Sequence, residues 1–154
     1  MSEAWLWHLD PKNPKLLLHD IVKKVLIVED DPKIAKALAL RVGNAGYETL
    51  LAYDALAGVS MAVKLRPDLV LLDISLPAGN GFSVAERIQK MIPKATPIIF
   101  LTASKEASFI EKAITLGAAG YFEKPYNSEA LLDTIRQRLS DQPERQSDGP
   151  KFAL

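Results

Sequence analysis

The chain has 154 residues, of which 48% are hydrophobic, and this composition suits one packed domain and would leave two domains cramped. Lysine plus arginine and aspartate plus glutamate both number 19, so the net charge indicates neither a nucleic-acid nor a membrane partner. The absence of cysteine excludes disulfide frameworks, thiolate metal sites and thiol nucleophiles.

From residue 24 onward, apolar runs of strand length alternate with segments of helical periodicity, a pattern that predicts an α/β fold with helices around a parallel sheet. Five strands are expected, at residues 24–28, 47–52, 69–73, 97–102 and about 121–123. Five helices are expected to alternate with them, at about residues 32–43, 55–65, 82–91, 105–116 and 128–139. Asp31 is a good N-cap for the first helix because Pro32 follows it, and Pro67 predicts that the second helix ends before Arg66.

Both ends of the chain fall outside this alternation, which we assign to one domain at residues 23–140. Residues 1–22 form an extension that carries Trp5 and Trp7, the only tryptophans, and we expect it to be either mobile or packed against a neighbouring chain. Residues 141–154 are polar with two prolines, which predicts a disordered tail. No apolar run approaches the roughly 20 residues of a membrane span, and the N-terminus does not resemble a secretory signal. We therefore expect a cytoplasmic protein without a membrane partner.

Acidic residues follow two of the buried strands at their carboxyl ends. Glu29 and Asp30 come directly after the first strand, and Asp73 is the last residue of the third. Because parallel strands place their carboxyl ends at one edge of the sheet, these carboxylates are expected to lie together. Crowded carboxylates repel one another unless they are protonated or joined by a cation, and oxygen ligands favour a hard ion such as Mg²⁺.

Each of these carboxylates taken alone would more often be a helix cap or a solvated loop charge, and Asp31 is interpreted as such a cap. Their joint placement favours function, because Thr102 ends the fourth strand and Lys124 follows the fifth. The same edge would then hold a pair of acids, a nucleophilic carboxylate, a hydroxyl and an ammonium group. This set of groups is suited to phosphoryl transfer.

Six short motifs stand in order along the chain: Val28-Glu29-Asp30, Asp73-Ile74-Ser75-Leu76-Pro77, Gly81, Leu101-Thr102-Ala103, Gly120-Tyr121 and Lys124-Pro125. In the order and spacing of these motifs, the span from Lys24 to Leu139 resembles the receiver domain of two-component response regulators. The resemblance covers about three quarters of the chain. It implies a three-layer, doubly wound, flavodoxin-like fold with five parallel strands in the order 2-1-3-4-5.

The resemblance also implies a role for each residue at the site. Asp73 would accept a phosphoryl group from a phosphohistidine, and Mg²⁺ would be held by Glu29, Asp30, Asp73 and the backbone carbonyl of Ser75. Lys124 would contact the phosphoryl oxygens, and the peptide bond that precedes Pro125 would be cis. The protein would thus be a regulator that phosphorylates and dephosphorylates itself rather than a conventional enzyme.

In the same family, Thr102 moves toward the phosphoryl group and the aromatic ring of Tyr121 rotates inward, which changes a partner-binding surface. The implied partners are a sensor histidine kinase or a histidine phosphotransfer protein, and a downstream effector, with no direct contact to nucleic acid. The kinase side is expected to dock on the first helix and the loop after the fifth strand, through Ile34, Pro125 and Tyr126. Core packing is the alternative for Ile34.

Departures from the family pattern bear on assembly and on competing functions. Ala119-Gly120 stands where regulators that dimerise through their fourth and fifth helices have an acidic pair, so a homodimer is an open alternative rather than an expectation. A phosphohydrolase of the haloacid-dehalogenase type would need an aspartate two residues after the nucleophile, and Ser75 occupies that position. A degenerate receiver that only binds partners is a third alternative, which the full set of acidic, hydroxyl and lysine residues disfavours.

Overall fold

The computed structural model describes residues 22–77, 79–140 and 151–153. Their parallel sheet has the strand order β2-β1-β3-β4-β5-β6. The strands are β1 (Lys24–Val28), β2 (Glu48–Ala52), β3 (Leu69–Asp73), β4 (Ile98–Thr102), β5 (Gly120–Glu123) and β6 (Lys151–Ala153). The helices are α2 (Pro32–Asn44), α3 (Ala55–Leu65), α4 (Gly81–Met91), α5 (Ala107–Thr115) and α6 (Ser128–Leu139). The first five strands confirm the predicted order 2-1-3-4-5.

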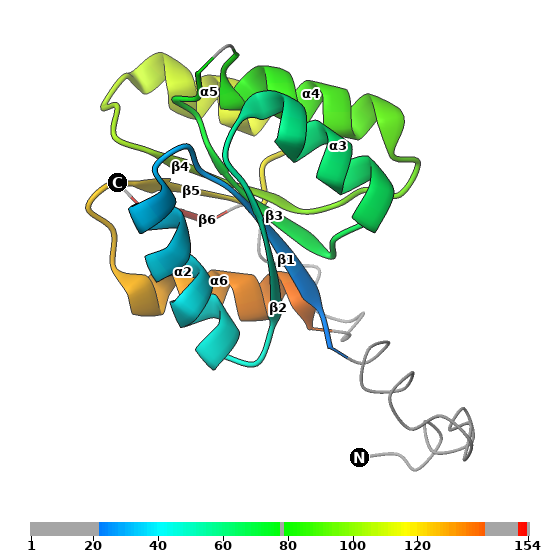
Figure 1. Cartoon of the computed structure of the whole chain (residues 1–154). Coiled ribbons are helices and arrows are strands. Elements are labelled where there is room, and N and C mark those ends of the chain that lie inside the picture. The colour runs from blue at the N-terminus through cyan, green and yellow to red at the C-terminus, as the bar shows by residue number, and fades with distance from the viewer. Residues whose placement is uncertain (1–21, 78, 141–150, 154) are drawn as a thin grey trace, which may run out of the picture.

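Helices cover both faces of the sheet, which makes three layers (Figure 1). Helices α3, α4 and α5 lie on one face and α2 and α6 on the other, and each face has its own buried apolar cluster. Every residue of β3 and of β4 is buried, as expected of central strands with helices on both sides. None of the helices in the described parts of the chain is both long enough and apolar enough to cross a membrane.

The helix starts follow from polar side chains that accept hydrogen bonds from free backbone N–H groups. Asp31 caps α2 by accepting from the N–H groups of Lys33 and Ile34, as the sequence predicts. Asp54, Asn80 and Asn127 cap α3, α4 and α6 in the same way. These caps fix where each helix leaves the carboxyl edge of the sheet.

Two helix ends show how local chemistry sets the boundaries. Arg66 ends α3 in a left-handed conformation with φ 48°, because the proline that follows it disfavours the right-handed helical region. Helix α5 begins at Ala107, two residues later than predicted. The N–H of Ser104 instead donates to Oγ1 of Thr102, and its own Oγ accepts from the N–H of Glu106, so these residues form a turn.

The structure adds a strand that the sequence does not predict. Among the described residues, Lys151–Ala153 pairs in parallel with β5 and adds a sixth strand to the five predicted strands. The expectation of a disordered tail over residues 141–154 is therefore wrong for these three residues. The rest of that segment up to residue 150, and residues 1–21 of the predicted extension, lie outside the described residues.

Candidate functional site

The carboxyl ends of β1, β3 and β5 bring the predicted acidic and basic residues to one place. Glu29 and Asp30 follow β1, Asp73 ends β3, and Lys124 follows β5. Glu29 and Asp73 are buried, at 3% and 4% exposure, whereas Asp30 is exposed. One carboxylate oxygen from each of the three acids lies within 4.8 Å of the others. The structure therefore places these residues together, as the sequence predicts.

This cluster has the donor set and the spacing that suit Mg²⁺. Octahedral Mg²⁺ binds oxygen at about 2.1 Å, so two opposite ligands lie about 4 Å apart, and a cluster within 4.8 Å needs only small side-chain movements to close on the ion. The acids differ in exposure, and the exposed Asp30 leaves a side open to water. Mg²⁺ usually keeps several water ligands.

Lys124 lies between the two buried acids. Its Nζ donates to Oδ2 of Asp73 at 2.8 Å and to Oε2 of Glu29 at 3.1 Å. Burial alone would lower the pKa of Lys124, but its hydrogen bond and charge contact with Asp73, together with the charge of Glu29, raise that pKa above its ordinary value. The lysine is therefore a fixed positive charge at the site.

Glu29 is held in a very different electrostatic balance. Burial, and then the hydrogen bond to and repulsion from Asp73, raise the pKa of Glu29 from 4.5 to about 7, although the charge of Lys124 opposes this shift. Its Oε1 accepts a hydrogen bond from the backbone N–H of Asp31 at 3.3 Å. Glu29 thus binds a proton near neutral pH unless another cation replaces that proton.

Asp73 is oriented by contacts to both carboxylate oxygens. Oδ2 accepts from Lys124, and Oδ1 accepts from the backbone N–H of Ser75 at 2.8 Å. Ser75 thus contacts Asp73 through its backbone N–H. The role of its backbone carbonyl as a metal ligand stays a prediction. Behind the strand end, Gly81 donates its N–H to the carbonyl of Ile74 at 2.8 Å. A Cβ at Gly81 would collide with the Asp73 carbonyl oxygen and would lie 2.8 Å from the Ile74 Cα.

The two residues predicted to form a switch are both buried next to the site. Thr102 is fully buried, and its Oγ1 accepts a hydrogen bond from the N–H of Ser104 at 3.0 Å. Tyr121 is 1% exposed and belongs to the same apolar cluster as Phe82 and Phe100, so its ring points inward in this structure. Burial, followed by the charges of Glu123 and Glu106, raises the pKa of the Tyr121 hydroxyl.

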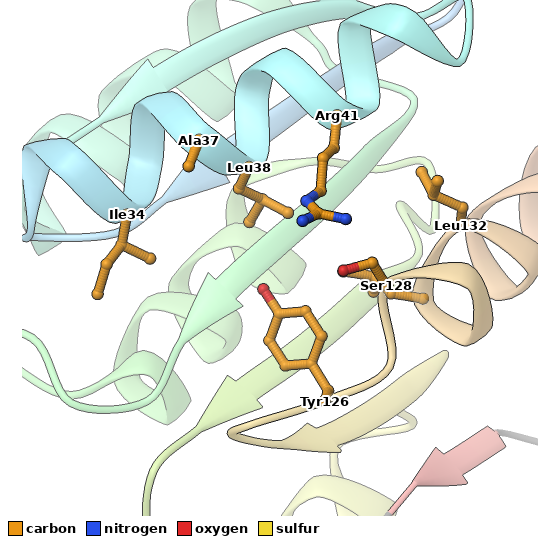
Figure 2. A pocket seen from close by; sticks show the side chains of 8 residues that line it. Ile34, Ala37, Leu38, Arg41, Tyr126, Ser128 and Leu132 are labelled. Atoms are coloured by element: carbon orange, nitrogen blue, oxygen red, sulfur yellow. The ribbon is translucent and has the colours of Figure 1, made fainter.

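Two of the three residues predicted to contact a partner, Ile34 and Tyr126, line a groove between α2 and α6 (Figure 2). The groove has a volume of about 180 Å³, and Tyr126 points into it from the loop that follows β5. Ile34 lines it and is 42% exposed, so the alternative that Ile34 is a core residue is wrong. Pro125 does not line the groove; it is exposed, and the peptide bond that precedes it is cis, as the resemblance implies.

Sequence reasoning missed some contacts that hold the site residues in place, because backbone atoms make these contacts. The N–H groups of Asp31 and Ser75 hold Glu29 and Asp73, yet any residue type except proline could supply them. No side-chain pattern in the sequence could reveal these contacts. Gly81 did have a signal, since it follows a loop rich in turn residues, but the reason for glycine there is the closeness of the Asp73 backbone.

Comparison with known proteins gives the same picture from sequence. Residues 25–136 match the family model for the response regulator receiver domain. The chain is 34% identical over 117 residues to the DNA-binding dual master transcriptional regulator RpaA of Synechocystis, an alignment that covers 75% of this chain and 48% of that protein. It is 39% identical over 115 residues to the transcriptional regulatory protein DltR of Streptococcus agalactiae, covering 75% and 51%. The chain thus spans about half the length of the curated relatives it matches.

Solved structures show the same fold. A CheY-like receiver domain protein from Methanospirillum hungatei superposes with a TM-score of 0.72 at 29% identity, covering 76% of this chain and 93% of that one. The chemotaxis response regulator CheY4 of Vibrio cholerae superposes with a TM-score of 0.68 at 32% identity, covering 77% and 99%. The chain belongs to the receiver domain family of two-component response regulators.

Proposed function

We propose that this receiver domain is a phosphorylation-dependent signalling switch and that Asp73 is its phosphoacceptor. The observation that carries the proposal is the setting of Asp73, a buried carboxylate with Lys124 at 2.8 Å and two further acids within reach of a shared cation. A carboxylate oxygen of Asp73 would attack the phosphorus atom of a phosphohistidine. The O–P bond would form as the P–N bond breaks, leaving an acyl phosphate and a neutral histidine after proton uptake.

The resident ion in this proposal is Mg²⁺, held by Glu29, Asp30, Asp73 and the carbonyl of Ser75. Bound there, it would offset the negative charge of the acids and of the phosphoryl oxygens. Lys124 already donates to Asp73, so a modest movement of its ammonium group would bring it to a phosphoryl oxygen. A domain with these groups is expected to take phosphate from small donors as well as from a kinase, and to lose it by slow hydrolysis.

The switch in the proposal consists of Thr102 and Tyr121. The Thr102 oxygen accepts from Ser104, which leaves the hydroxyl hydrogen as a donor for a phosphoryl oxygen on the neighbouring strand. The inward ring of Tyr121 lies one strand further along the sheet. Movement of Thr102 toward the phosphoryl group would change the packing of that ring and so the surface around β5.

We further propose that the phosphohistidine donor docks on the groove between α2 and α6. Ile34 offers exposed apolar surface there and the partly buried Tyr126 also lines the groove, while the exposed Pro125 directly follows Lys124, whose ammonium group contacts Asp73. The same proposal has three further parts: a cytoplasmic location, a downstream effector that is a protein rather than a nucleic acid, and domain limits at residues 23 and 140. The balanced charge of the chain supports the protein effector.

Intact mass after incubation with acetyl phosphate and Mg²⁺ tests the central claim. We expect one added phosphoryl group on the unaltered chain and none on Asp73→Asn or in excess chelator. Asp54→Asn is the matched control, because asparagine caps a helix about as well as aspartate and Asp54 caps α3. Labelling of Asp73→Asn to the same extent as the unaltered chain would refute the assignment.

A further inference from the structure

The edge of β5 carries a feature that the phosphoacceptor site does not use. In a five-stranded sheet β5 would be an edge strand with backbone N–H and C=O groups open to any extended segment. Here Lys151–Ala153 occupies that edge in parallel register, with Gly120 opposite Lys151, Tyr121 opposite Phe152 and Phe122 opposite Ala153. The kind of ligand that this edge accepts is therefore an extended backbone segment that adds a strand.

The connection explains why a segment of the same chain can reach this edge. Parallel neighbours need a crossover of about a dozen residues or more, and α6 (Ser128–Leu139) lies between β5 and β6 in the sequence. β5, α6 and β6 thus repeat the strand-helix-strand unit from which the rest of the sheet is built. The pairing covers only three residues, and so short a strand can detach without unfolding the central sheet.

A short path joins this edge to the acid cluster. Glu123, the last residue of β5, lies opposite Thr102, and the N–H of the next residue, Lys124, donates to the Thr102 carbonyl at 2.7 Å. The Nζ of the same Lys124 donates to Asp73 at 2.8 Å. The strand that β6 covers therefore ends one residue before Lys124, which contacts the proposed phosphoacceptor.

We propose that Lys151–Ala153 is a reversible cover of the β5 edge and that phosphorylation of Asp73 releases it, which opens a strand-addition surface. The cover is docked in the structure while Lys124 bridges Glu29 and Asp73. A phosphoryl group on Asp73 gives Lys124 and Thr102 new acceptors, so the carboxyl end of β5 leaves the geometry in which β6 pairs with it. Coupling between two sites is reciprocal, so loss of the cover in turn favours phosphorylation. The release of Lys151–Ala153 on phosphorylation rests on the function proposed above, whereas the covering of the β5 edge does not.

Hydrogen exchange measured by mass spectrometry on the full chain tests the cover without any phosphate. The variant with both Phe152→Pro and Ala153→Pro lacks two adjacent backbone N–H groups. Adjacent N–H groups of a strand point to opposite sides, so one of these two faces β5 and its loss should weaken the pairing. We expect severalfold faster exchange in the peptide that contains Gly120–Glu123 and no change in Leu69–Asp73. The matched control, Phe152→Ala with Ala153→Ser, retains both N–H groups and should keep the β5 peptide protected.

Two results of that experiment would overturn the cover. Exchange at β5 that is the same in the proline variant and in the unaltered chain would mean that residues 151–153 do not protect the edge. Protection that falls on dilution, together with a dimer mass by light scattering, would mean that the strand comes from a second copy of the chain.

Acetyl phosphate with Mg²⁺ then tests the coupling, with intact mass recording the phosphorylated fraction. In the phosphorylated chain we expect exchange in the peptide that contains residues 151–153 to rise by roughly fivefold or more, the lower range of ordinary coupling between sites. Asp73→Asn under the same conditions should show no rise. A fully phosphorylated chain whose residues 151–153 stay protected would overturn the coupling, whereas absence of phosphorylation would instead overturn the function on which it rests.

Discussion

At the scale of single residues, the site depends on how two buried carboxylates share one ammonium group. Lys124 contacts both Glu29 and Asp73, and the pKa of Glu29 is nevertheless raised to about 7. The proton on Glu29 and a bound cation are therefore alternative ways to relieve the same repulsion. This competition makes both stability and metal binding depend on pH.

The first prediction at this scale concerns Glu29 and the stability of the metal-free protein. The pKa of Glu29 is 4.5 in the unfolded chain and about 7 in the folded protein. Between pH 4.5 and about 7, the native state therefore keeps a proton on Glu29 that the unfolded chain has lost. The contribution of Glu29 to the free energy of unfolding is complete below about pH 4.5 and is lost as the pH rises through 7. Urea unfolding without divalent ions should give a lower free energy of unfolding at pH 7.5 than at pH 5, and Glu29→Gln should flatten this difference. A difference that is equally large in Glu29→Gln would assign it to other groups.

The second prediction concerns the closeness of Gly81 to the Asp73 strand end. A Cβ at Gly81 would contact backbone atoms of Asp73 and Ile74, which cannot move aside as a flexible side chain can. Gly81→Ala should therefore destabilise the fold by about 1–3 kcal/mol in denaturant unfolding. Gly43→Ala is the control, since Gly43 lies in α2 and a Cβ added there would meet nothing within 4 Å; this change should stabilise the fold by about 0.5–1 kcal/mol. Equal effects of the two substitutions would contradict the packing argument.

At the scale of elements, most of the fold could be predicted because each element carries its own signal. The uninterrupted apolar sequence of β3 and the capping residues Asp31 and Asp54 specify strands and helix starts locally. β6 could not be found in this way, because three residues are too few to show a periodicity and their pairing depends on an open edge elsewhere in the fold. The bridge from Lys124 to Glu29 and Asp73 could be predicted only as a shared edge, since the atoms that meet depend on tertiary packing.

The prediction at this scale separates docking from chemistry at the groove between α2 and α6. Ile34→Glu places a charge on the proposed docking surface, and it should slow phosphotransfer from a histidine kinase that labels the unaltered chain by about tenfold, as expected for the loss of an apolar contact at an interface. Labelling by acetyl phosphate and the melting temperature should not change. Leu56→Glu is the control, because Leu56 is 71% exposed on α3, across the sheet from the groove. An equal loss of labelling from both phosphoryl donors would indicate a damaged site.

At the scale of the whole molecule, the acid cluster is a cost to folding that a cation can remove. Three carboxylates converge at the edge where β1 and β3 end, and both strands lie in the middle of the sheet. Lys124 supplies one positive charge to the two buried acids Glu29 and Asp73, which offsets part of the repulsion, and the exposed Asp30 adds a third negative group. Stability of the entire domain is thereby linked to occupancy of this edge.

Mg²⁺ should therefore stabilise the native state, by on the order of 1–3 kcal/mol at concentrations well above the dissociation constant. Asp30→Asn should stabilise the metal-free protein as well, but by less than about 1 kcal/mol, because an exposed carboxylate is already screened by water. The same substitution removes a proposed ligand, so it should also abolish most of the shift in melting temperature that Mg²⁺ produces. Thermal unfolding of the unaltered chain and of Asp30→Asn, each with Mg²⁺ and with chelator, gives the four melting temperatures that these predictions compare. A shift of equal size in the two proteins would show that Mg²⁺ acts elsewhere than at Asp30.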